Sequence, residues 1–362
     1  MKKIDRLVCV EDFAQEAKQV LAKNAKDYFT SGADDEITVV QNTEAFSRLL
    51  IRPRVLRDVS VRNLSTMILG KSVKVPLGVS PSAFQGLAHS DGECGSAKAV
   101  EAIGGIFILS VFATKSYEEI AAAAPNVRRW FQFYMHKDRS LTRGIINRAQ
   151  KAGFEAIVLT LDAQSVGNRR SSRRDPLEFP SHLKLPNATP DAAQKELKIF
   201  ELHDIMDHGV TWEAVSWLKS ISNLPLVVKG IQTVEDAIIA VSHGVDAIFV
   251  SNHGGRQVDT AVPTCDILPE IVRTVKGKCE IYVDGGVRRG TDIFKALALG
   301  ANMVFVGRPI VYGLAVGGTV GATKVMHILR DELDLTMALS GVSNVSELTP
   351  SYVNRVPGHS HL

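Results

Sequence analysis

Residues 237–251 read AIIAVSHGVDAIFVS, and residues 294–307 read FKALALGANMVFVG. Both stretches begin with apolar residues at helical spacing, pass through a glycine, and end in a short apolar run. Each therefore predicts a helix, a turn and a buried strand, in that order. Strands that are apolar on both faces are typical of parallel sheets covered by helices.

The same unit recurs along most of the chain. Amphipathic segments separate eight apolar runs that predict strands, at 75–80, 105–110, 130–134, 156–161, 225–230, 247–252, 280–285 and 303–307. Eight parallel strands close a barrel. The rival fold, a doubly wound open sheet, usually has a G-x-G-x-x-G loop after its first strand, and VPLGVSPSAFQG contains none. We therefore predict an α/β protein with a (β/α)8 TIM barrel.

The remaining segments fit a single domain over residues 1–362. Residues 10–50 carry apolar residues at helical spacing, and the connection after the fourth strand is polar and much longer than the others. We expect four parts: an N-terminal helical cap at 1–70, the barrel at 71–345, a lid loop at 163–210 within it, and a C-terminal tail at 346–362.

Composition excludes several classes of function. The formal net charge is only +3 and no basic block is present, which argues against a nucleic-acid partner. The four cysteines are scattered without metal-binding spacing, so we expect reduced thiols and no metal site. No apolar run is long enough to span a bilayer, and we expect no membrane partner.

Polar and small residues collect where the predicted strands end. In a TIM barrel these ends form the active site. From the first strand to the eighth they are Ser80, Pro81 and Ser82; Ser110; Gln132 and Tyr134; Thr160 and Asp162; Lys229; Ser251, Asn252 and His253; Asp284, Gly285 and Gly286; and Gly307 and Arg308. We therefore expect the site at the C-terminal mouth of the barrel.

The last two strand ends are suited to phosphate. The segments DGGVRRGTD (284–292) and VGRP (306–309) each place glycine and arginine, at Arg288 and Arg308, directly before a helix. Backbone N–H groups at a helix N-terminus bind phosphate, and arginine adds paired hydrogen bonds. A lysine at 229, on another strand, would stabilise the anionic reduced ring of a flavin, which favours a phosphate-bearing cofactor over a free phosphate.

The turn VSNHGGRQVD (250–259) supplies the groups for acid chemistry. His253 can accept a proton near neutral pH, and Asp162 from the fourth strand could stabilise the resulting imidazolium. Arg256 in this turn, and Arg169 after the fourth strand, could hold a substrate carboxylate by paired hydrogen bonds. Tyr134 and Tyr28 could add hydrogen bonds to a carboxylate or a hydroxyl.

These motifs together resemble the FMN-dependent L-2-hydroxy acid oxidases, the glycolate oxidase family. The resemblance covers nearly the whole chain, from DYFTSGADDE through PSAFQGLAHSDGE and FQFYMHKDR to VSNHGGRQVD, DGGVRRGTDIFKALALGA and VFVGRPIVYGLA. It implies a peroxide-forming oxidase that converts an L-2-hydroxy acid and O2 to a 2-oxo acid. The alternative within the class is a dehydrogenase that passes electrons to an acceptor other than oxygen.

The resemblance also implies a role for each matching residue. His253 corresponds to the catalytic base, Asp162 to its partner, and Tyr134 to the group that bonds the substrate hydroxyl. Tyr28, Arg169 and Arg256 correspond to the carboxylate-binding groups. The FMN contacts correspond to Pro81, Ser82, Ala83, Ser110, Gln132, Thr160, Lys229 and Ser251 for the ring and ribityl chain, and Asp284, Gly285, Gly286, Arg288, Gly307 and Arg308 for the ribityl and phosphate end.

One departure from the family pattern bears on the substrate. The chain has LSVFAT where glycolate oxidases usually have L-S-S-W-A-T, so Phe112 takes the place of a tryptophan that lines the substrate pocket. The smaller ring leads us to expect a preference for acids larger than glycolate. The resemblance further implies a homotetramer. The final residues Ser360, His361 and Leu362 resemble the S-K-L signal, which predicts recognition by the peroxisomal import receptor and a location in peroxisomes.

Overall fold

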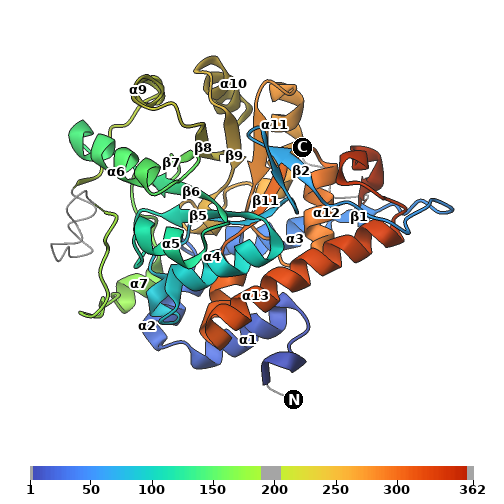
Figure 1. The fold of residues 1–362 in the computed structure, drawn as a ribbon, viewed down its shortest axis with the longest axis horizontal. Coiled ribbons are helices and arrows are strands. Elements are labelled where there is room, and N and C mark those ends of the chain that lie inside the picture. Colours follow the sequence, from blue (N-terminus) through green and yellow to red (C-terminus); the bar gives the residue numbers. More distant parts are fainter. Residues whose placement is uncertain (1–2, 189–204, 357–362) are drawn as a thin grey trace.

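Eight parallel strands close into a barrel in the computed structural model, which describes residues 3–188 and 205–356 (Figure 1). The strands are β4 (Leu77–Val79), β5 (Ile106–Ser110), β6 (Arg128–Phe133), β7 (Ile157–Thr160), β8 (Leu226–Ile231), β9 (Ala247–Val250), β10 (Glu280–Val283) and β11 (Met303–Val306). Each pairs with its successor along the chain, and β11 pairs with β4 to close the ring. The predicted (β/α)8 fold is confirmed, with one strand in each predicted run.

A helix follows each strand and covers the outside of the barrel. These helices are α4 (Gly92–Ile103), α5 (Tyr117–Ala123), α6 (Arg139–Lys151), α9 (Glu213–Ile221), α10 (Val234–Ser242), α11 (Thr264–Val275), α12 (Gly290–Ala298) and α13 (Arg308–Leu339). The glycine between helix and strand in the two repeated stretches has a structural cause. Gly244 and Gly300 have φ angles of +66° and +104°, which glycine adopts without steric cost, so each helix can end and the chain can turn into the next strand.

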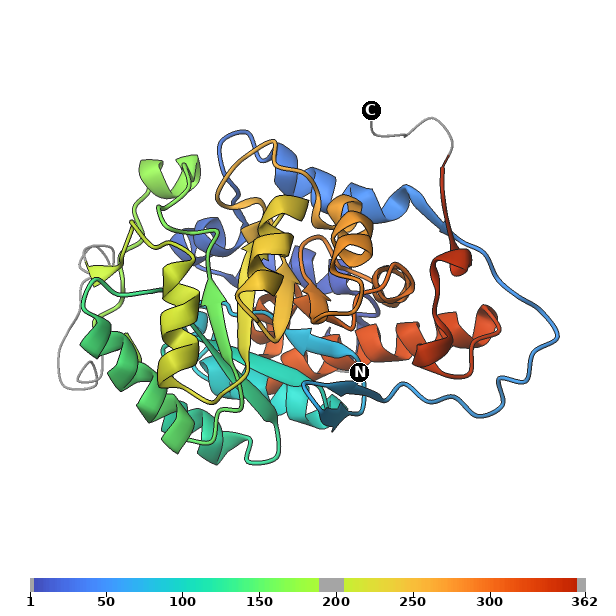
Figure 2. The same ribbon diagram turned by 90° about the horizontal axis from the view of Figure 1, so that it is seen from above.

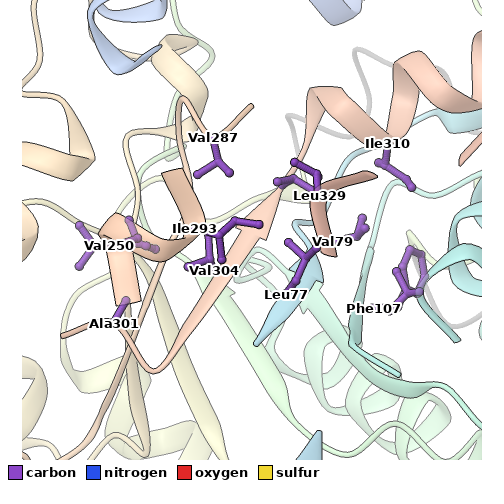
Figure 3. Close-up of a cluster of buried hydrophobic side chains, with 14 of the residues drawn as sticks. Leu77, Val79, Phe107, Val250, Val287, Ile293, Ala301, Val304, Ile310 and Leu329 are labelled. Carbon is purple, nitrogen blue, oxygen red and sulfur yellow. The ribbon is translucent and has the colours of Figure 1, made fainter. Parts of the chain in front are cut away.

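The strands are continuously apolar because both of their faces are buried. Along β11, Met303 and Phe305 pack inside the barrel against Trp130 and Phe249. The alternating residue Val304 belongs to the outer layer, where it packs with residues of the surrounding helices (Figure 3). The barrel interior is therefore a packed core, and any ligand has to bind at one of its ends.

A short antiparallel hairpin closes the N-terminal end of the barrel. Its strands β2 (Thr66–Ile68) and β3 (Lys71–Val73) place Ile68 and Val73 in the interior cluster. Arg128, the first residue of β6, donates hydrogen bonds of 3.1 Å to the carbonyls of Ile68 and Lys71. The sequence analysis did not predict this hairpin. With this end filled, the C-terminal mouth is the end that is open to a ligand.

The predicted N-terminal helices are confirmed as α1 (Val10–Val20), α2 (Lys23–Thr30) and α3 (Ile37–Ser47), which follow a single turn, η1 (Lys3–Arg6). Helix α1 packs along α13, and α3 lies beside the turn η3 (His253–Gly255). After α3, strand β1 (Leu49–Ile51) pairs with β12 (Val353–Arg355), next to the turns η4 (Val345–Glu347) and η5 (Pro350–Tyr352). Figure 2 shows the chain between β1 and β2 running in an extended path along the outside of the molecule.

The structure describes only the two ends of the predicted lid at 163–210. The first end contains the short helix α7 (Arg170–Arg174), which lies beside α2. The second end returns to the barrel through an antiparallel bridge between Met206 and His136. Residues 189–204, and the C-terminal tripeptide at 360–362, lie outside the described residues.

Candidate active site at the C-terminal mouth of the barrel

A cavity of about 460 Å³ opens at the C-terminal mouth, and every barrel strand contributes to it. All of the residues to which a catalytic, substrate-binding or FMN-binding role was assigned line this cavity except Asp162 and Ser251. These two contact lining residues from behind, because Asp162 bonds His253 and Ser251 bonds Lys229. The polar strand ends that the sequence placed together are therefore together in space.

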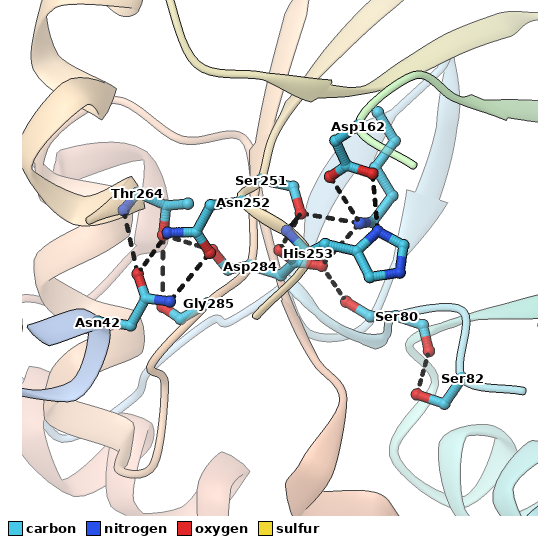
Figure 4. A network of polar contacts seen from close by, with 11 residues as sticks. Asn42, Ser80, Ser82, Asp162, Ser251, Asn252, His253, Thr264, Asp284 and Gly285 are labelled. Atoms are coloured by element: carbon cyan, nitrogen blue, oxygen red, sulfur yellow. Dashed lines mark hydrogen bonds and ion pairs between the residues drawn. The ribbon is translucent and has the colours of Figure 1, made fainter. Parts of the chain in front are cut away.

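His253 and Asp162 form a direct imidazole–carboxylate contact in the site. The Nδ1 of His253 lies 2.7 Å from the Oδ1 of Asp162, and the other ring nitrogen points away from this pair (Figure 4). Burial lowers the pKa of His253 below its usual value, although the charge of Asp162 opposes the shift. Burial favours the protonated form of Asp162, but His253 and Lys229 outweigh it and hold the pKa of Asp162 below its usual value. These directions favour an ionised Asp162 beside an imidazole that can accept a proton.

Lys229 extends this pair into a buried polar network that also includes Ser251 and Asp284. Its Nζ donates to the Oγ of Ser251 at 2.8 Å and lies 3.9 Å from Asp162 Oδ2 and 3.6 Å from Asp284 Oδ2. Asp284 also accepts hydrogen bonds from the hydroxyls of Ser251 and Ser80, at 2.6 and 2.7 Å. One buried cation thus lies between two carboxylates, and its charge faces the cavity that Lys229 lines.

Two side chains in the cavity have polar atoms that are buried without a partner. Among the described residues, neither Gln132 Nε2 nor Thr160 Oγ1 makes a hydrogen bond. Both residues line the cavity at the ends of β6 and β7. A buried polar group without a partner costs about 1–3 kcal/mol, so such atoms in a cavity mark the place of a ligand that bonds them.

The opposite side of the cavity is built for an anion. Gly307 caps the N-terminus of α13, and Arg288 lies just before α12. A Cβ added to Gly307 would meet only Ser82 Oγ, at 3.6 Å, so open space adjoins the first N–H groups of α13. Helix N-terminal N–H groups with an arginine nearby suit a phosphate. The donor set along the cavity therefore fits a flavin ring at the polar network and its phosphate at α13.

Two guanidinium groups face the outer part of the cavity without an acidic partner. In the part of the chain that the structure describes, neither Arg256 nor Arg169 forms an ion pair with a carboxylate. Burial, together with the like charge of Arg169, lowers the pKa of Arg256 to about 9. Arg256 lies over the ring of Tyr28, with its Cζ 4.9 Å from the ring centroid. An anion that enters here would supply the missing countercharge.

An aromatic wall borders the same part of the cavity. The rings of Phe112 and Tyr134 stack at 5.5 Å, and Phe84 stacks on Phe112 at 6.4 Å. Burial raises the pKa of Tyr134, so its hydroxyl remains a hydrogen-bond donor. The wall is apolar except at that hydroxyl.

Sequence reasoning missed several residues that line the cavity. Phe84 lies in the loop after β4, Met206 comes from the far end of the lid, and Gln257 follows the His253 turn. Gln257 has a clear role, since its Oε1 accepts a hydrogen bond of 3.0 Å from Arg169 Nη2. Phe84 and Met206 carried no signal, because an apolar residue in a loop has no periodicity that marks it.

The barrel and this site define a flavin-dependent oxidoreductase of the (β/α)8 class. The chain belongs to the FMN-dependent dehydrogenase family, whose model matches residues 17–355, and its cofactor is FMN. It is 45% identical over 350 residues to glycolate oxidase 3 of Oryza sativa subsp. indica, covering 95% of each chain. It is 44% identical over 364 residues to 2-hydroxyacid oxidase 1 of Homo sapiens, covering 98% of each chain.

Solved structures agree with the sequence comparisons. A mandelate oxidase structure with benzoyl-formic acid superimposes with a TM-score of 0.88 at 36% sequence identity, covering 97% of this chain and 98% of the other. None of the helices that the structure describes combines the length and apolar composition of a membrane span. Within the same residues, no cluster of three or more His, Cys, Asp or Glu side chains could hold a metal ion.

Proposed function

We propose that this protein oxidises an L-2-hydroxy acid to the 2-oxo acid and passes the electrons to O2, which forms hydrogen peroxide. One observation carries the proposal: His253, which bonds Asp162 behind it, lines the same cavity as Arg256 and Arg169, whose guanidinium groups have no acidic partner among the described residues. A base next to an anion site suits a substrate that carries both an acidic group and a proton to be removed.

The positions of the polar groups suggest how the substrate binds. Arg256 and Arg169 hold the carboxylate, and Tyr28, whose ring lies under Arg256, adds a hydrogen bond. Tyr134 donates to the 2-hydroxyl or 2-oxo oxygen, because its raised pKa keeps the phenol protonated. An acid held at its carboxylate and at its 2-oxygen in this way would have its C2 between His253 and the proposed flavin site.

His253 would take one proton from the substrate, from the 2-hydroxyl if C2 loses its hydrogen as a hydride, or from C2 if a carbanion forms first. In both routes the electron pair passes to the cofactor, and Asp162 stabilises the imidazolium. Because Asp162 is nearly inaccessible, with its side chain only 4% exposed, its charge acts on the imidazole with little screening by water. FMN supplies the two-electron acceptor that O2 then reoxidises. Lys229, on β8, would stabilise negative charge on the reduced cofactor ring.

The residues that hold FMN follow from the donor set. The ring and ribityl chain would be held by the strand-end groups Pro81, Ser82, Ala83, Ser110, Gln132, Thr160, Lys229, Ser251, Asp284, Gly285 and Gly286. Gln132 Nε2 and Thr160 Oγ1 support this placement, since each gains the partner that it lacks. Arg288 and the N–H groups at Gly307 and Arg308 hold the phosphate.

The decisive experiment measures peroxide formation by the FMN-loaded protein with glycolate, lactate, mandelate and 2-hydroxyoctanoate, in parallel with flavin reduction under anaerobic conditions. We expect at least one L-acid to reduce the flavin and to give stoichiometric peroxide in air. Reduction without peroxide would instead favour a dehydrogenase with another acceptor. Absence of reduction by the whole panel would contradict the proposal.

The aromatic wall predicts the size of the preferred acid. We expect Phe112→Trp to shift the ratio of kcat/KM values toward glycolate by about 10- to 200-fold relative to 2-hydroxyoctanoate. The larger indole would occupy space beside Tyr134 that a longer side chain needs. Comparing the two kcat/KM values in parent and variant checks this, and an unchanged ratio would assign the size limit to the lid.

Assembly and location are proposed on separate grounds. The extended chain after β1 exposes Val55, Leu56 and Val61 by 80%, 103% and 81%. Exposed apolar residues close together in the chain are candidates for contacts with other chains, and light scattering would test the homotetramer that the family resemblance implies.

The terminal Ser360-His361-Leu362 supports recognition by the peroxisomal import receptor. Deleting these three residues should leave a tagged protein in the cytosol with unchanged activity. Import of the shortened protein would place the signal elsewhere in the chain.

A further inference from the structure

The turn that carries His253 has an unusual backbone. His253, Gly254 and Gly255 have φ angles of +56°, +65° and +74°, so three consecutive residues lie in the left-handed region. Glycine adopts this conformation freely, but for a histidine it is uncommon and carries strain. Such strain persists only where the surroundings hold the backbone in place.

The side chain of Arg308 supplies much of that hold. Its Nη1 donates to the carbonyl of Gly254 at 2.9 Å, directly after the histidine. Its Nε donates to Phe29 O at 3.1 Å and its Nη2 to Ser31 O at 3.0 Å. Each nitrogen of one rigid guanidinium therefore bonds a different carbonyl, and together they join the His253 turn to the end of α2.

The end of α2 is itself part of the substrate side of the cavity. Tyr28 lies on its last turn, and Arg256 Nη1 donates to the carbonyls of Tyr28 and Ser31 at 2.6 and 3.1 Å. The C-terminal carbonyls of a helix favour cations. Arg308 and Arg256 thus share Ser31 O, so the α2 end, the carboxylate-binding arginine and the His253 turn form one connected unit.

The main chain and the side chain of Arg308 lie in different surroundings. Its main chain begins α13, beside the anion-binding end of the cavity, whereas three of the five guanidinium N–H donors go to main-chain carbonyls. No carboxylate pairs with the guanidinium among residues 3–188 and 205–356. The contacts of the Arg308 guanidinium therefore depend on the directions of its N–H groups and not only on its charge.

We propose that the Arg308 side chain is a positioning residue for the catalytic turn: it holds His253 and the α2 end in register with each other. This inference rests on the proposed function, because it concerns the base of that reaction. The sequence assigned Arg308 to the phosphate end of FMN as a whole. The contacts assign its guanidinium to the substrate side and leave Arg288 as the side-chain cation for the phosphate.

Lysine substitutions distinguish the two roles. Lysine keeps the positive charge but has one nitrogen, so it serves a phosphate and cannot reach three carbonyls in different directions. We expect Arg308→Lys to retain FMN through dialysis as the parent does, while flavin reduction at saturating substrate slows about 100-fold, a loss that misplacing a catalytic group by about 1 Å can cause. The matched substitution Arg288→Lys should lower FMN retention more than Arg308→Lys does.

Two further readouts keep the test decisive. In Arg308→Ala, millimolar guanidinium should restore part of the lost reduction rate, because the free ion can donate to the same carbonyls. The pH dependence of reduction should shift in Arg308→Lys, since a displaced His253 loses its contact with Asp162. FMN absorbance after dialysis reports folding and cofactor binding independently of turnover.

Several outcomes would overturn the inference. Reduction by Arg308→Lys at the parent rate would do so, as would a loss of FMN that accounts for all of the lost activity. An Arg308→Ala protein that guanidinium does not rescue, combined with an unshifted pH profile in Arg308→Lys, would also do so. A parent protein that no 2-hydroxy acid reduces would refute the proposed function instead.

Discussion

Replacing His253 with glutamine is expected to leave FMN bound and to slow flavin reduction by about 10²- to 10⁴-fold. Glutamine keeps a hydrogen-bonding group next to Asp162 but cannot accept the substrate proton. Rapid-mixing measurements of flavin reduction at saturating substrate check this directly. The protein offers a matched control in His243, which lies after α10, stacks on Trp212 and bonds Ser216, outside the cavity. His243→Gln should reduce its flavin at the parent rate.

The pH dependence of the parent enzyme is a second test of whether His253 is the base. With His253 as the proposed base, the reaction needs its neutral form, and burial lowers the pKa of that imidazole below its usual value of 6.5. The value of kcat/KM should therefore rise with pH through a pKa below 6.5 and be level at neutral pH and just above. In His253→Gln this ionisation should disappear from the profile. A variant that keeps both the parent rate and the acidic limb would show that another group is the base.

Replacing Arg256 with methionine should weaken substrate binding more than any other change to the carboxylate site. Losing one member of a buried, hydrogen-bonded charge pair costs about 2–5 kcal/mol, which corresponds to about a 30- to 5,000-fold rise in the dissociation constant. Arg256→Lys should recover only part of the loss, because lysine cannot form two parallel hydrogen bonds with a carboxylate. Binding of an unreactive carboxylate, followed by the flavin absorbance, measures the effect without turnover.

Two results would separate the possible causes of weaker binding. Arg330 is a suitable control, because it lies on the outside of α13 and pairs with its neighbour Asp331. Arg330→Met should bind the carboxylate as the parent does. If Arg256→Met also binds it with parent affinity, the carboxylate is held elsewhere in the cavity.

The barrel could be predicted because its evidence repeats along the chain. Runs such as AIFV and MVFV are apolar on both faces, which excludes a half-exposed strand, and a glycine precedes each at the same place in the repeat. The hairpin β2–β3 could not be predicted. Its strands have three residues each, and only the barrel interior shows that Ile68 and Val73 are buried.

The site was predictable to the extent that strand ends define it. Asp162 and His253 are 91 residues apart, and only closure of the barrel brings them to 2.7 Å, yet both lie just past a predicted strand. Side-chain direction was not predictable in the same way. The sequence places Arg308 before a helix, but its guanidinium points to carbonyls of α2 and the His253 turn, which local sequence does not specify.

The hairpin at the closed end of the barrel also limits the path by which product can leave. Since packed aromatic residues fill the barrel below the site, the 2-oxo acid has to leave through the opening by which the hydroxy acid entered. Product and substrate carry the same carboxylate and would occupy the same arginines. With the proposed site, we expect accumulated product to compete with fresh substrate and to slow turnover when product concentrations are high.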